Sequence, residues 1–155
     1  MNGTSALTIN TGDTWNGQIK QTAGTLTVLN DDYTKSSTTG YLTSTGGAIV
    51  IGDIVTPIAG TLKLNNTNDS IAAATTVTIN TNGTLNQSAG TVILNGTGAG
   101  IDNWNGAISL SGTGDLTLSG RTDETTYTPR GEVSNIKARH DNYSNMVGVQ
   151  FQYNF

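Results

Sequence analysis

The single histidine and the adjacent acidic pairs are the positions of this 155-residue sequence at which acid–base chemistry could occur. His140 lies in a polar stretch beside Asp141, so a solvated loop residue is expected there instead of a general base. Asp31-Asp32 and Asp123-Glu124 are neighbours in sequence, and neighbours on a strand point to opposite faces. Neither pair is therefore expected to act as a catalytic dyad, and the sequence predicts no catalytic residues and no enzyme.

The sequence also contains only incomplete forms of the motifs that bind cofactors or metals. Residues 96–100 are glycine-rich but lack the Lys-Ser/Thr that completes a phosphate loop, so a turn is predicted. The run from Gly112 to Leu116 is partly similar to a calcium-binding nonapeptide, but it does not iterate. No motif supports calcium at Asp13, Asp53 or Asp102. Because cysteine is also absent, no disulfide or Cys-based metal site can form, and neither cofactor nor metal is predicted.

Two tryptophans are the candidate ligand-binding residues. Trp15 and Trp104 each begin the pattern Trp-Asn-Gly-x-Ile. Exposed rings at these positions would stack on the sugar rings of host or environmental glycans, and the alternative is that both rings pack or cap a repeat. Threonine pairs suggest a different ligand, because ice-binding solenoids use flat ranks of hydroxyls and methyls, although strand propensity also explains such pairs. The pairs are Thr25/Thr27, Thr43/Thr45 and Thr76/Thr78.

The overall composition narrows the fold class. Charged residues make up only 12% of the chain, whereas Thr (28), Gly (20), Asn (17) and Ser (11) fill about half of it. These residues are poor helix formers, which leaves an all-β protein or a disordered tract. The net charge of −4 and the pI near 4.6 argue against nucleic-acid binding. No apolar run is long enough for a membrane-spanning helix.

Internal repeats favour order over disorder. Ala23-Gly24-Thr25-Leu26 recurs at residues 59–62 and 89–92, with a degenerate copy at 114–116, and each copy opens a short strand with alternating apolar residues. A second family of alternating strands precedes these copies, and Asn-Gly turn signals lie between the two families. Units this short must stack to bury an apolar face, so the sequence predicts a parallel β-solenoid of about four imperfect repeats. Residues 31–46 are expected to be a loop insertion.

An antiparallel β-sandwich or meander is the alternative fold. In that arrangement, residues 77–85 would form a hairpin across Asn82-Gly83.

Composition changes near Arg121, which divides the chain into a β-repeat region (1–120) and a polar linker with a C-terminal β-hairpin or strand (121–155). The final ten residues alternate strictly. One face is apolar and ends in aromatics, and the other face is mostly polar. The residues of the apolar face are Val147, Val149, Phe151, Tyr153 and Phe155. They are predicted to face a membrane or to mediate assembly.

This ending resembles the terminal strand of Gram-negative outer-membrane β-barrels, and the repeats before it resemble the passenger segments of autotransporter (type V secretion) adhesins. The resemblance implies a cell-surface β-solenoid whose last strand is read by the barrel assembly machinery. Two features depart from it. Residues after 120 leave room for only about two or three strands, and Met1 to Thr4 lacks the features of a signal peptide. The chain is therefore expected to be a fragment, a mature form or an engineered chain.

These observations together predict a non-catalytic structural or adhesive β-repeat protein, secreted or displayed on the outer membrane of a Gram-negative bacterium. It would assemble through its C-terminal amphipathic strand, either with itself or with the barrel assembly machinery. A glycan- or ice-binding β-solenoid module is one alternative. The other is a filament subunit in which the last strand completes a neighbour's sheet.

Overall fold

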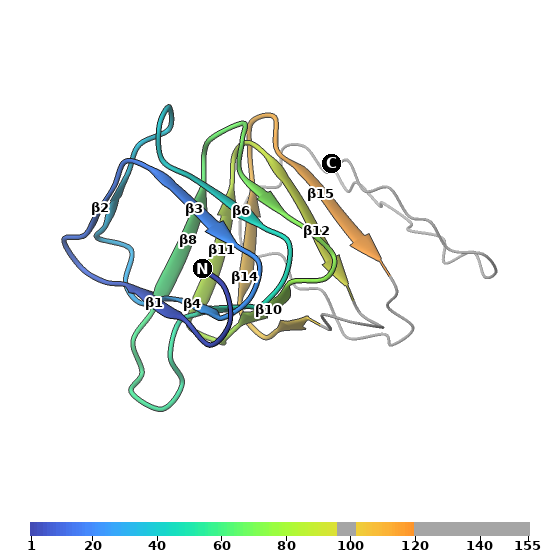
Figure 1. Cartoon of the computed structure of the whole chain (residues 1–155). Coiled ribbons are helices and arrows are strands. Elements are labelled where there is room, and N and C mark those ends of the chain that lie inside the picture. The colour runs from blue at the N-terminus through green and yellow to red at the C-terminus, as the bar shows by residue number, and fades with distance from the viewer. Residues whose placement is uncertain (96–101, 120–155) are drawn as a thin grey trace, which may run out of the picture.

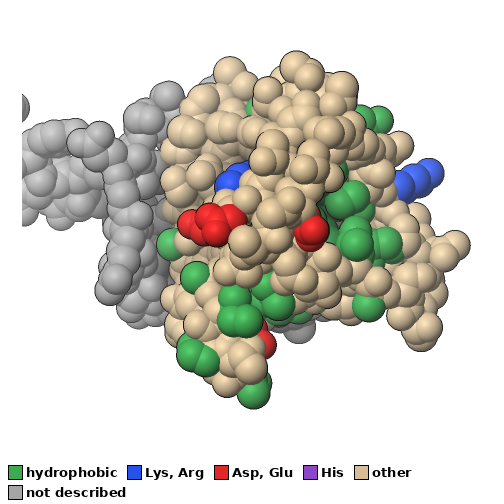
Figure 2. Space-filling model, turned by 90° about the vertical axis from the view of Figure 1, so that its left-hand side faces the viewer, with side chains coloured by type: hydrophobic (Ala, Val, Ile, Leu, Met, Phe, Trp, Pro, Cys, Tyr) green, Lys and Arg blue, Asp and Glu red, His purple; other side chains and the backbone are tan. Residues whose placement is uncertain are grey.

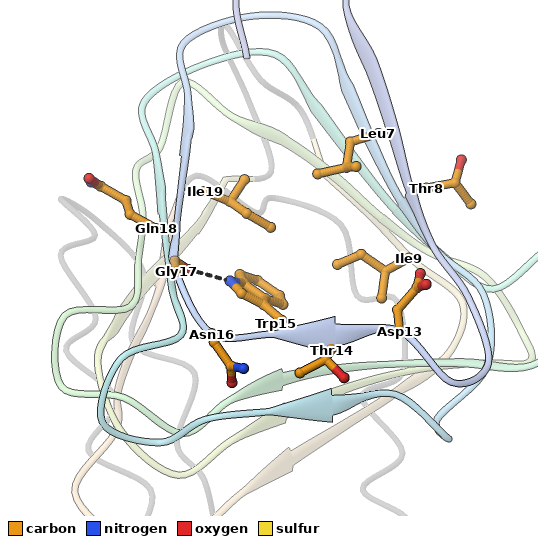
Figure 3. A pocket seen from close by; sticks show the side chains of 10 residues that line it. All are labelled: Leu7, Thr8, Ile9, Asp13, Thr14, Trp15, Asn16, Gly17, Gln18 and Ile19. Carbon is orange, nitrogen blue, oxygen red and sulfur yellow. Dashed lines mark hydrogen bonds between the residues drawn. The ribbon is translucent and has the colours of Figure 1, made fainter.

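The computed structural model of the chain describes residues 1–95 and 102–119, and within these ranges it contains strands and no helix. The strands wind into a parallel β-solenoid with a three-sided cross-section (Figures 1 and 3). The predicted fold class is therefore confirmed for the repeat region. The predicted C-terminal hairpin or strand, with its apolar face, lies outside the described residues.

The first and third faces of the solenoid are each one five-stranded sheet. The first face consists of β1 (Ala6–Ile9), β4 (Thr25–Val28), β7 (Ala48–Ile51), β10 (Thr76–Ile79) and β13 (Asn103–Trp104). The third face consists of β3 (Gln18–Gln21), β6 (Tyr41–Ser44), β9 (Ser70–Ile71), β12 (Thr91–Asn95) and β15 (Asp115–Ser119).

The second face is divided into two sheets. One pairs β2 (Thr14–Trp15) with β5 (Thr34–Lys35), and the other consists of β8 (Gly60–Leu64), β11 (Gly83–Gln87) and β14 (Ala107–Leu110). A single bridge between Asn30 and Gly60 lies between them.

The described residues make about five turns, where the sequence predicted about four imperfect repeats, because the repeated motif does not mark whole turns. Its three full copies lead into β4, β8 and β12, which belong to three different faces. In every copy, a Cβ added to the motif glycine would lie 2.1–2.3 Å from a carbonyl oxygen of the preceding turn. The residues are Gly24, Gly60 and Gly90. The motif therefore encodes the start of a strand that passes close to the turn before it, on whichever face that strand lies.

Residue spacing between turns is uneven. Paired residues on the first face are 19, 23, 28 and 25 positions apart, at Ala6–Thr25, Thr25–Ala48, Ala48–Thr76 and Thr78–Asn103. The stretch 31–46 is only partly a loop, because it contains β5 and β6. The hairpin considered across Asn82-Gly83 does not form: β10 and β11 lie in different sheets, and the Asn-Gly pair turns a corner between them.

Apolar side chains form inward columns that run along the stack. On the first face, Ile9, Val28, Ile51 and Ile79 are in register, and Trp104 continues the same column. All four aliphatic residues are at most 5% exposed. Each such side chain contributes roughly 1.5–3 kcal/mol through burial, so the apolar positions of the sequence stabilise neighbouring turns instead of an isolated repeat.

Corner glutamines join one turn to the next. Gln21 and Gln87 are fully buried, and each precedes a motif glycine by three residues. The Gln21 amide donates to the carbonyls of Gly24 (3.1 Å) and Ala48 (2.8 Å), and the Gln87 amide donates equivalently to Gly90 (3.1 Å) and Asp115 (3.0 Å). Each amide therefore binds a carbonyl of its own corner and one of the following turn, which satisfies buried acceptors at the edge of the ladder.

Candidate functional site

The most unusual local chemistry of the described residues is a buried cluster between the second and third turns, which we call the core charge cluster: Lys35, Asn65 and Asp69. Lys35 is the last residue of β5, and the other two residues flank the loop between β8 and β9. The Lys35 ammonium lies 2.9 Å from Asp69 Oδ2 and 2.8 Å from Asn65 Oδ1. Both charged side chains are 0% exposed.

Asp69 is held rigidly by the backbone as well. Its Oδ1 accepts from the amide of Leu42 (2.8 Å), and its Oδ2 accepts from the amide of Asn66 (2.9 Å). β9 is only two residues long and pairs with only part of β6. The carboxylate of Asp69 therefore supplies a hydrogen bond to β6 at a position that β9 does not reach. The side-chain amide of Asn65 completes the cluster, because its Nδ2 donates to the backbone carbonyl of Lys35 (3.5 Å).

One aromatic ring lies against the ammonium, and a second ring packs beside the first. Its nitrogen lies 5.1 Å from the centroid of the Trp15 ring, and the Trp15 and Tyr33 rings are 6.5 Å apart. Burial lowers the pKa of Lys35, and the hydrogen bond and negative charge of Asp69 oppose this shift. Lys35 is therefore held where its neutral amine form is more accessible than in an exposed lysine.

Tyr33 closes the gap between the two sheets of the second face. Its hydroxyl donates to the carbonyl of Thr61 (2.8 Å) and accepts from the amide of Lys63 (2.8 Å). These groups belong to β8, on the edge toward the preceding turn, so the hydroxyl occupies the place of a neighbouring strand. Burial raises the pKa of Tyr33 far above its ordinary value, which keeps the hydroxyl protonated and able to donate.

Asp102 has a similar role in the last turns. Its carboxylate is 8% exposed and accepts from the amides of Val77 and Asn95. Burial raises the pKa of Asp102 to about 6, although both of these hydrogen bonds oppose the shift. Among the described residues, no group of three or more potential metal-ligating side chains is present.

The first turn leaves a hollow of about 450 Å³ at its open end (Figure 3). Leu7, Ile9, Trp15 and Ile19 point into it, while polar side chains such as Thr8 and Gln18 point outward. Trp15 is 6% exposed, and its indole nitrogen donates to the carbonyl of Gly17 (2.7 Å).

The two tryptophans therefore lie in the interior columns and not on an outer face. Trp104 packs against the core from β13. The pattern Trp-Asn-Gly-x-Ile forms the same local structure twice, a two-residue strand, a corner and the start of a longer strand, but on different faces. Aromatic stacking of Trp15 on a sugar would have to occur at the open end of the first turn.

Two other surfaces could contact a partner. Ile54 and Val55 are 64% and 86% exposed in the loop between β7 and β8, which forms the protruding lobe at the bottom of the view in Figure 2. On the first face, Thr8, Thr27, Val50, Thr78 and Asn103 form one outward rank. Thr25 and Thr76 share a second rank with Ala6 and Ala48, whereas Thr43 lies on the third face.

Sequence reasoning placed Asp31-Asp32, Tyr33 and Lys35 together in a loop and assigned no role to Asn65 or Asp69. Asp31 and Asp32 are exposed, whereas Tyr33 and Lys35 are buried. A signal was present in the alternation Tyr33, Lys35, which places both residues on the same side of a strand. The predicted assembly residues Val147 to Phe155, together with His140, Asp123 and Glu124, lie outside the described residues.

No protein-family model, no curated protein and no solved structure matches this chain. Within the described residues there is no helix that could cross a membrane.

Proposed function

We propose that this protein is a non-catalytic structural or adhesive β-solenoid of a bacterial cell surface, secreted or held at the outer membrane of a Gram-negative bacterium. The observation that carries the proposal is the use of its buried polar groups. Tyr33, Asp69 and Asp102 each bind main-chain groups of an adjacent turn or loop. This arrangement stabilises a continuous stack, which is what a projecting or polymerising element requires.

The mechanism is mechanical. Each turn adds about 4.8 Å to the stack and is joined to its neighbours by parallel ladders on its faces. Buried columns and corner glutamines connect the same turns independently of these ladders. A pull along the stack would therefore have to break several kinds of contact at once.

Assembly is proposed to occur through the C-terminal strand that the sequence predicts. Its apolar face consists of Val147, Val149, Phe151, Tyr153 and Phe155, and its opposite face is mostly polar. Such a strand fits either a lipid-exposed position or a neighbour's sheet. Its partners are a second copy of this chain or the barrel assembly machinery.

Paired substitutions of the two faces test this assignment. Val149→Asp with Phe151→Asp should abolish assembly, measured as surface display in cells and as the oligomeric state of the full chain with and without detergent. Gln150→Asp with Gln152→Asp adds the same charge to the other face and should be tolerated. Equal behaviour of the two variants would refute assembly through the apolar face. A filament that forms without detergent would favour strand donation over a membrane position.

A second candidate function is ligand binding by the first face. Its outward ranks bring Thr25, Thr27, Thr76 and Thr78 onto one parallel sheet, and this shared face supports binding to ice. Thr27→Lys with Thr78→Lys should abolish inhibition of ice recrystallisation, while Thr84→Lys on the second face should not. Glycan binding is tested on the same variants with a glycan array, where Trp15→Ala reports on the open end. Blank results for the unmodified protein in both assays would exclude this candidate.

A further inference from the structure

We propose that the core charge cluster is a site of self-modification, at which Lys35 Nζ and Asn65 Cγ form an intramolecular isopeptide bond with Asp69 relaying the proton. The inference rests on three contacts: ammonium to carboxamide oxygen (2.8 Å), ammonium to carboxylate (2.9 Å), and the Asn65 amide to the Lys35 carbonyl (3.5 Å). It is independent of what the surface of the solenoid binds.

Proximity favours the reaction. Nζ already touches the carboxamide oxygen, which is about 1.2 Å from the carbon that would be attacked. The carboxamide is held at both ends, since its oxygen accepts from Lys35 Nζ and its nitrogen donates to the carbonyl of the same residue. An orientation fixed in this way turns the attack into a unimolecular step with little entropy left to lose.

The nucleophile has the environment that this chemistry needs. A lysine reacts only as the neutral amine, and desolvation beside aromatic rings makes that form more accessible. The Lys35 side chain is 0% exposed, its nitrogen lies over the Trp15 ring, and burial lowers its pKa. Its ion-pair partner, the Asp69 carboxylate, is in position to accept the proton.

Asn65 is the acyl donor and not Asp69. A neutral carboxamide is a better electrophile than a carboxylate, and both Asp69 oxygens already accept hydrogen bonds from backbone amides. Asn65 is also only half-buried, unlike its two partners, so ammonia released there has a short path to solvent.

The step balances in atoms and charge. Lys35 transfers one proton to Asp69, and the neutral amine forms the C–N bond to Asn65 Cγ. The nitrogen then loses a second proton, and the carboxamide NH₂ leaves as ammonia after Asp69 has relayed a proton to it. Ammonia takes up the remaining proton, so the net change is Lys–NH₃⁺ plus Asn carboxamide giving a secondary amide plus ammonium, with Asp69 regenerated and no oxidant consumed.

The bond would link the second and third turns at the break between the two sheets of the second face. β5 and β8 belong to separate sheets there, and the Tyr33 hydroxyl is inserted between them. A covalent bridge from the end of β5 to the residue after β8 would prevent the stack from opening at this break.

Tryptic peptide mapping of the purified full chain tests the proposal. An unmodified chain is cut after Lys20, Lys35 and Lys63, which gives peptides 21–35, 36–63 and 64–121. A linked chain resists cleavage after Lys35 and yields 21–63 joined to 64–121, lighter by about 17 Da, the mass of one ammonia. Tandem spectra should place the link at Lys35 and Asn65.

Matched variants separate the bond from other losses of ammonia. Lys35→Arg and Asn65→Ala should abolish the joined peptides, and Lys63→Arg, which keeps a tryptic site and changes a lysine outside the cluster, should retain them. Succinimide formation at Asn-Gly pairs gives the same mass loss but joins no peptides and persists in Lys35→Arg. Complete cleavage after Lys35 in the folded wild-type protein would overturn the proposal. A link to Asp69 with loss of water would overturn the assignment of Asn65.

Discussion

The Tyr33 hydroxyl should carry a measurable share of the stability of the solenoid, because it replaces a missing strand. In Tyr33→Phe the ring remains, but the carbonyl of Thr61 loses a donor and the amide of Lys63 loses an acceptor. Tyr33 is 2% exposed, so its hydroxyl is not easily replaced by solvent. Tyr41→Phe is the matched control, since no hydrogen bond of its hydroxyl to another described residue is found.

The magnitude follows from the two unsatisfied groups. Each buried donor or acceptor left without a partner costs roughly 1–3 kcal/mol, so the two groups together give an expected loss of about 2–6 kcal/mol, the upper part applying if water stays out. Tyr41→Phe should change the free energy of unfolding by less than about 0.5 kcal/mol. Because domains of this size are stable by only about 5–15 kcal/mol, the first effect is large.

Urea unfolding followed by circular dichroism measures the difference between the variants, and amide hydrogen exchange locates it. A loss of about 2 kcal/mol corresponds to roughly 30-fold faster exchange of the Lys63 amide where reclosing is faster than chemical exchange, so that the rate reports the opening equilibrium. Faster exchange should centre on β8 and not extend to β12. Equal stability of the two Phe variants, or unchanged protection at Lys63, would refute the view that the hydroxyl acts as a strand edge.

Three further outcomes are expected. Since burial raises the pKa of Tyr33 in the folded state, its contribution is present below pH about 10 and is lost as the pH rises further, so alkaline unfolding should be steeper in the wild type than in Tyr33→Phe. The pKa of Asp102 is raised to about 6, so its contribution to stability is full near pH 4 and is lost as the pH rises through 6. Urea midpoints should therefore show the wild type losing on the order of 1–2 kcal/mol relative to Asp102→Asn between pH 4 and 7. A constant difference between the two proteins would contradict this. Gly83→Ala would bring a Cβ to 2.3 Å from the carbonyl oxygen of Ile51 and should cost about 1–3 kcal/mol, whereas Gly17→Ala, with nothing within 4 Å, should be nearly neutral in thermal unfolding.

Local alternation was enough to predict the strands and their inward faces. Leu26 and Val28, for example, were paired by period-2 spacing and are both fully buried. The Asn-Gly corner after Trp15 could also be predicted, because the residue types that favour turns are recognisable from local sequence alone. Parallel stacking followed from the shortness of the repeats, which cannot bury an apolar face alone.

The number of turns could not be derived from the same signals. The motif glycine reports a close approach to a carbonyl of the preceding turn, and that approach occurs on all three faces. The number of motif copies therefore gives the number of such strand starts and not the number of turns of the solenoid. Buried polar residues were missed for a related reason: the partners of Lys35 are 30 and 34 residues away, and only the register between turns brings them together.

One rule connects the polar residues that sequence reasoning left unassigned. Every two-residue strand of the described solenoid is preceded by a side chain that binds main-chain groups: Asp13 before β2, Tyr33 before β5, Asp69 before β9 and Asp102 before β13. A strand of two residues supplies few ladder bonds, and the hydrogen bonds of these side chains replace part of the missing ladder. Three of the 11 acidic residues of the chain therefore lie directly before the shortest strands of the solenoid. Because these side chains bind main-chain groups, they stabilise the stack where its ladders are shortest, and this use of polar residues supports the proposed structural role.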